Sequence, residues 1–85
     1  MAFKIRKGVV AINGTAFDVA IGVPYLRGLG ASVNGQLVTV VAPTGTPARR
    51  TWSVHRGPGL GYDHGLTWDQ AAATAVRMHL EKRAA

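Results

Sequence analysis

The sequence predicts an α+β domain in which an antiparallel sheet of four or five strands is covered on one face by a single C-terminal helix. Three observations support this prediction. Asn-Gly pairs at residues 13–14 and 34–35 interrupt runs of β-branched residues, residues 49–56 alternate in polarity, and residues 68–83 carry helix signals. The 85-residue length allows one domain, residues 1–85, with one small core.

The first two strands are predicted at about residues 2–12 and 15–23, joined by the tight turn at residues 13–14. A two-residue hairpin turn of type I′ needs a positive φ at both central residues, and Asn followed by Gly adopts these angles at little cost. Such a turn fixes the register of the two strands and places Val10 opposite Phe17.

The apolar residues of the first strand change parity, because Phe3 and Ile5 are odd-numbered whereas those near the turn are even-numbered. A β-bulge at residues 7–8 reconciles the two sets, since one extra residue restores the alternation. We therefore expect Ile5 to face Ile21 and Phe3 to face Val23. Two basic side chains then point away from the core, Lys4 and Arg6.

The second Asn-Gly pair predicts another hairpin, with strands at about residues 29–33 and 36–42. A Pro- and Gly-containing loop follows and leads to a strand at about residues 49–56. Alternation places Trp52 and Val54 on the core side of this strand.

The helix is predicted at about residues 68–83, where Thr67 as N-cap and Gln70 three residues later form a capping box. His79 is expected to pack half-buried beside the apolar side. The predicted apolar stripe comprises Ala72, Val76 and Leu80, with Trp68, Ala73 and Ala75.

The charge is strongly basic, with ten Lys and Arg residues against four Asp and Glu and a formal net charge of +6. Such a charge favours nucleic acid or an acidic protein surface as the partner, although it also serves solubility alone. The chain has no cysteine, so a thiolate metal site is excluded. No stretch is typical of a membrane span or a signal peptide, and we expect a cytoplasmic protein.

The candidate site is a basic, open sheet face, provided that the first and last strands lie near each other. Arginine offers a planar fork to phosphate oxygens, and short hydroxyls add hydrogen bonds. The alternative is a face that is merely solvated and discourages pairing of sheet edges. The predicted nucleic-acid-binding residues are Lys4, Arg6, Arg49, Arg50, Thr51, Ser53, His55 and Arg56.

Catalysis is not indicated. The run at residues 62–64, Tyr-Asp-His, has neither a nucleophile motif nor a second carboxylate near it, and the three histidines lack metal-ligand spacing. The glycine-rich segment from residue 57 to residue 65 is expected to be a flexible loop. We therefore expect no enzyme activity, no cofactor and no metal.

Residues 49–80 carry a strand with Trp-x-Val, a Gly-rich turn and Thr-x-x-x-Ala-Ala at a helix start. This outline resembles the sheet-plus-helix pattern of integrase arm-binding domains, and the resemblance implies that the sheet face enters the major groove of DNA. In size the chain is similar to small phage-encoded inhibitors such as anti-CRISPR proteins.

The sequence therefore predicts a small non-enzymatic nucleic-acid-binding or nucleoprotein-associated domain. The alternative is a protein-binding module, such as a phage-type inhibitor that occupies a partner's surface. The choice between DNA and RNA, and the oligomeric state, are left open.

Overall fold

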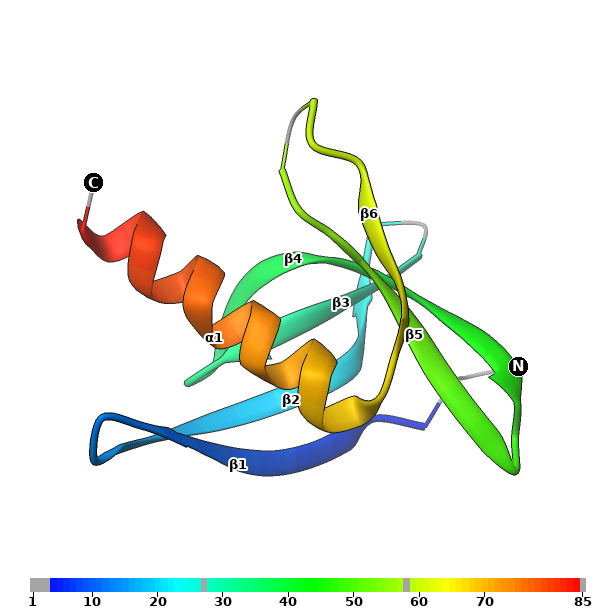
Figure 1. Cartoon of the computed structure of the whole chain (residues 1–85), viewed down its shortest axis with the longest axis horizontal. Coiled ribbons are helices and arrows are strands. Elements are labelled where there is room, and N and C mark those ends of the chain that lie inside the picture. The colour runs from blue at the N-terminus through cyan, green and yellow to red at the C-terminus, as the bar shows by residue number, and fades with distance from the viewer. Residues whose placement is uncertain (1–3, 27, 58, 85) are drawn as a thin grey trace.

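The computed structural model describes residues 4–26, 28–57 and 59–84. It is a curled antiparallel sheet with one C-terminal helix packed against it (Figure 1). The α+β prediction is confirmed, with six strands in place of four or five, and the strands follow chain order across the sheet. The elements are β1 (Arg6–Ile12), β2 (Thr15–Tyr25), β3 (Gly28–Val33), β4 (Gln36–Thr46), β5 (Arg49–His55), β6 (Tyr62–Leu66) and the helix α1 (Trp68–Ala84).

The turn between β1 and β2 has the predicted type I′ character, with φ of 51° at Asn13 and 80° at Gly14. The register that this turn imposes places Val10 opposite Phe17, as predicted. The second Asn-Gly pair, at residues 34–35, adopts φ values of 51° and 82° and joins β3 to β4. Both hairpins therefore follow from local turn chemistry.

The predicted bulge at residues 7–8 is wrong. The β1–β2 ladder runs to the pairing of Arg6 with Ile21 without any shift in register. The glycine at position 8 has a different role, because the Trp68 ring lies against it and occupies the space that a Cβ atom would take. Gly8 therefore permits close packing between β1 and the start of the helix.

The unbroken register corrects the predicted faces of the first basic residues. Arg6 pairs with the buried Ile21, and paired residues share a face, so Arg6 lies on the face that α1 covers. Lys4 precedes β1 and is exposed. Ile5 does not face Ile21 and instead lines a hollow on the other face. The predicted pairing of Phe3 lies outside the described residues.

Strand β2 extends beyond residue 23 through Pro24, which pairs with Leu29 of β3. Proline is tolerated there because β1 stops pairing at Ile21, so no neighbour on that side needs its missing N–H. Strands β2 and β3 therefore form a further hairpin.

The core lies between the sheet and α1. Trp52 and Val54 of β5 are buried, as predicted. The helix contributes mainly alanines, whose small side chains allow close approach to the sheet. The buried hydrophobic residues are Phe17, Val19, Ile21, Ala31, Val33, Val41, Trp52, Val54, Ala71, Ala72, Ala75 and Val76.

The start of α1 carries the predicted capping box. The backbone N–H of Gln70 donates to Thr67 Oγ1 over 3.3 Å, and the backbone N–H of Thr67 donates to Gln70 Oε1 over 3.0 Å. Towards the helix end His79 is buried with its ring edge-on to Phe17, at 6.4 Å between ring centroids. His79 is therefore a packing residue. Among the described residues, no helix is long and apolar enough to cross a membrane.

Strand β6 falls within the segment that we expected to be a loop. It pairs with β5 through His55 and Tyr62, Val54 and Asp63, and Trp52 and Leu66, with a register shift in between. Gly65, at φ 70°, lies in that shift. The extra strand extends the sheet beyond β5 and brings new side chains beside the candidate site.

Candidate nucleic-acid interface

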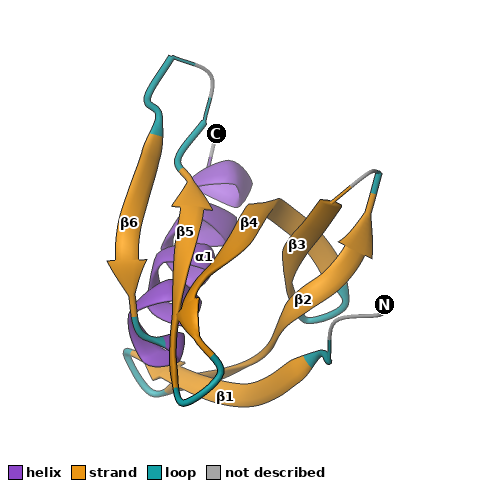
Figure 2. Ribbon diagram, turned by 90° about the vertical axis from the view of Figure 1, so that its right-hand side faces the viewer, coloured by secondary structure: helices purple, strands orange, loops and turns teal. Residues whose placement is uncertain are grey.

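Strand β5 separates its side chains cleanly between the two faces of the sheet. Trp52 and Val54 point into the core beneath α1, so the alternate residues lie on the other face, which we call the open face. Figure 2 shows α1 behind β5 and β6, so the helix does not cover this face. Four of the predicted residues are brought together there and form what we call the β5 row: Arg49, Thr51, Ser53 and His55.

The hydroxyl groups of the β5 row are already engaged. Thr51 Oγ1 shares a hydrogen bond with Thr44 Oγ1 of β4. Ser53 Oγ lies 2.8 Å from His64 Nδ1, and Ser53 is only 4% exposed. Ser53 therefore holds the His64 ring in place and does not itself offer a surface hydroxyl to a ligand.

Three aromatic rings lie side by side on the open face of β5 and β6. Tyr62 pairs with His55 in the ladder, and their ring centroids are 4.9 Å apart in an edge-on arrangement. Tyr62 also stacks with His64, with 6.1 Å between the ring centroids and an interplanar angle of 19°. Tyr62 is 44% exposed. We call these residues the ring row: His55, Tyr62 and His64.

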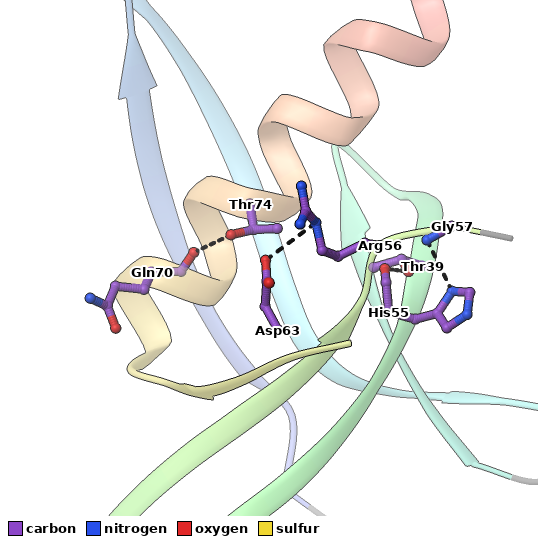
Figure 3. Close-up of polar contacts among 7 residues, drawn as sticks. All are labelled: Thr39, His55, Arg56, Gly57, Asp63, Gln70 and Thr74. Atoms are coloured by element: carbon purple, nitrogen blue, oxygen red, sulfur yellow. Dashed lines mark hydrogen bonds and ion pairs between the residues drawn. The ribbon is translucent and has the colours of Figure 1, made fainter. Parts of the chain in front are cut away.

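Hydrogen bonds fix both imidazoles of the ring row. His64 is held by Ser53, as described above. His55 Nδ1 accepts a 3.3 Å hydrogen bond from the backbone N–H of Gly57, two residues further along the chain (Figure 3). The two imidazoles next to Tyr62 are therefore held by partners in the protein.

Two of the predicted arginines lie on the other side of the sheet. Arg56 Nε is 3.5 Å from Asp63 Oδ2, and Figure 3 shows this pair beside α1. Asp63 pairs with the buried Val54, which confirms its position on the helix side. Arg50 has the parity of the buried Trp52, and its Nη1 donates a 3.1 Å hydrogen bond to the carbonyl of Thr44.

The acidic residues are arranged so that the open face of β4, β5 and β6 carries none of them. All four belong to the part of the chain that the structure describes. Asp18 lies on β2 opposite Val9, and Asp63 lies on the helix side. The other two, Asp69 and Glu81, belong to α1. Arg49 is therefore exposed on a part of the sheet, the open face of β4, β5 and β6, that carries no carboxylate.

The structure thus divides the eight predicted residues. It brings together the β5 row and places Arg6, Arg50 and Arg56 on the helix side, while Lys4 lies before β1 at the far edge of the sheet. Three strands separate β1 from β5 in the sheet order, so the condition that the first and last strands be neighbours is not met.

Sequence reasoning missed Tyr62 and His64 as site residues. A signal was present, because Tyr-x-His places both rings on one face of a strand and the segment follows β5 after a short, glycine-rich connection. The glycines on either side hid this signal, since glycine is depleted in strands and typical of loops.

A second feature of the open face lies at its opposite end. A hollow of about 660 Å³ lies over β1, β2 and the adjoining part of β3. Its rim includes Val9, which is 62% exposed, and Ile5, which is 38% exposed. The hollow is mainly apolar, and its two charged side chains, Lys7 and Asp18, are of opposite sign.

Among the described residues, no group of three or more acidic or histidine side chains is placed to hold a metal ion. The chain matches no protein-family model, no curated protein and no solved structure. The comparisons therefore add nothing to the resemblance with integrase arm-binding domains.

Proposed function

We propose that this protein is a non-enzymatic nucleic-acid-binding domain that holds its ligand on the open face of β5 and β6. The observation that carries this proposal is the composition of that face. Arg49 is exposed at one end of β5 and three rings lie at the other end, and no acidic residue of the chain shares the face of these two strands. An arginine contacts phosphate, aromatic rings contact bases, and the absence of carboxylates removes local repulsion of a polyanion.

The charge of the whole chain supports the same proposal. A net charge of +6 on 85 residues attracts a polyanion over about one Debye length, which is roughly 8 to 10 Å at moderate salt. The remaining basic residues contribute to this long-range field, including those such as Arg6 that lie on the other face of the sheet.

The test compares two arginines of the same chain segment. Binding of labelled single-stranded and duplex DNA and RNA is measured at several salt concentrations for the parent, Arg49→Gln and Arg56→Gln. We expect Arg49→Gln to lower the slope of log affinity against log salt by about 0.7 to 0.9, the value for one lost phosphate contact. Arg56 is the matched control, because it lies on the helix side and is paired with Asp63.

Two results would contradict the proposal. One is the absence of binding to every nucleic acid even at low salt. The other is an equal effect of the two substitutions, which would mean that only total charge matters and that the open face has no special role.

A second candidate function, a protein-binding module of the phage-inhibitor kind, is favoured by the hollow over β1 and β2. Exposed valine and isoleucine side chains around a hollow are typical of a surface that contacts protein. Such an interface depends weakly on salt. If the chain binds no nucleic acid, Val9→Lys provides the next test, since a charge at the rim of the hollow weakens an apolar contact.

A further inference from the structure

We propose that the ligand of this face is a single-stranded nucleic acid and that one of its bases stacks on Tyr62. This inference rests on the proposed function and specifies the ligand class. Tyr62 is 44% exposed and is the ring of this row that lies next to both of the others.

The support around Tyr62 is built before any ligand arrives. Ser53 fixes His64, the backbone N–H of Gly57 fixes His55, and both imidazoles lie beside the Tyr62 ring. A ring held in this way loses little conformational freedom when a base stacks on it, so more of the stacking energy appears as affinity.

The ring row requires bases that are free to stack. In a duplex the base faces are already stacked on one another, so an aromatic ring on a sheet reaches them only if the helix is opened. A single strand presents its base faces without that cost, and aromatic side chains on open sheet faces bind such strands with little sequence preference.

The β5 row provides a path for the backbone of such a strand. Arg49 and His55 are six positions apart, which corresponds to about 20 Å along an extended strand. Arg49 lies at the far end of this path, where its backbone N–H is anchored by a 3.2 Å hydrogen bond to Thr46 Oγ1. If one base of a single-stranded nucleic acid stacks on Tyr62 and its backbone runs along β5, a phosphate several nucleotides away from that base therefore lies near Arg49.

The experiment measures binding to three probes at one low salt concentration: a mixed-sequence single-stranded DNA of about 15 nucleotides, its duplex, and a strand of the same length with abasic sites at its central positions. The proteins are the parent, Tyr62→Phe, Tyr62→Ala and Leu60→Ala. Leu60 is the matched control, because it is 64% exposed near the same strand but carries no ring.

We expect the parent to prefer the single strand over both the duplex and the abasic strand. Tyr62→Ala should weaken single-strand binding roughly 5- to 150-fold, the range for one lost base–aromatic stack, while Tyr62→Phe and Leu60→Ala remain within about twofold of the parent. Thermal melts of each variant show whether the domain stays folded, which we expect because Tyr62 lies on the open face.

The outcomes separate this inference from the function on which it rests. Equal binding of intact and abasic strands, with no effect of Tyr62→Ala, overturns the stacking proposal but leaves phosphate binding in place. Tighter binding of the duplex overturns it in the same way. Failure of all three probes to bind overturns the proposed function itself.

Discussion

Replacing Gly8 by alanine tests the packing contact between β1 and Trp68 at the start of α1. The added Cβ atom falls on the Trp68 ring, with the far edge of the indole nearest. The ring cannot move away freely, because its Nε1 donates a 3.2 Å hydrogen bond to the carbonyl of Arg6. The substitution therefore forces either compression or the loss of that hydrogen bond.

The expected cost follows from these alternatives. Overpacking costs about 1 to 3 kcal/mol, and a lost hydrogen bond costs about 0.5 to 1.5 kcal/mol. Alanine regains about 0.5 to 1 kcal/mol over glycine inside a strand. We expect Gly8→Ala to lower the free energy of unfolding by about 1 to 3 kcal/mol, which corresponds to a fall in Tm of roughly 5 to 20 °C for a domain of this size.

The assay is thermal and urea unfolding in a double-mutant cycle with Trp68→Ala. Removing the indole creates room for the Cβ atom, so Gly8→Ala should cost little or nothing in that background. Gly28→Ala is the control, because Gly28 is also a strand glycine but a Cβ atom added there would meet no other atom within 4 Å. The reasoning is refuted if Gly8→Ala melts with the parent, or if it costs the same with and without Trp68.

Two further stability predictions concern features that the sequence itself indicated. Trp52→Ala should lower the free energy of unfolding by about 3 to 5 kcal/mol, because Trp52 is 1% exposed in the core. It should affect binding only through unfolding, so loss of binding with an unchanged melting curve would contradict this. Thr67→Ala should lower the free energy of unfolding by about 1 kcal/mol, because it removes the hydroxyl that accepts a hydrogen bond from the Gln70 N–H. The expected decrease in Tm is about 4 to 8 °C. An unchanged Tm would show that the cap contributes nothing.

The parts of the fold that could be predicted depend on neighbouring residues. Asn-Gly dictates its turn, the turn dictates the register, and the alternation around Trp52 separates core from open face. Each of these relations spans only a few residues, so the sequence shows it directly. The position of Arg49 on the open face follows from the same alternation.

The errors have a different origin. The bulge was inferred from the parity of Phe3 and Ile5 and assigned to Gly8, whereas Gly8 instead packs against Trp68, which is 60 residues away in the chain. No local pattern reports such a contact. The predicted position of Arg6 on the open face depended on this bulge and is wrong for the same reason, because a shift of one residue moves every side chain to the other face.

Strand β6 was missed because its sequence lacks the apolar alternation of a half-buried strand. It pairs only with β5 and turns mainly Leu66 and Asp63 towards the helix side, so it has little apolar surface to bury. Asp63 is accommodated there by Arg56. Edge strands need fewer apolar residues, and a pattern based on burial finds them poorly.

Strand β5 carries both the stability and the proposed binding surface, and it keeps them apart by alternation. Trp52 and Val54 are enclosed by the sheet and α1, so no ligand reaches them without unfolding. The ring row lies on the opposite face and rests on hydrogen bonds rather than on the core. Because the two faces share a backbone but no side chains, we expect substitutions of Tyr62 or Arg49 to change the proposed binding while the core stays the same.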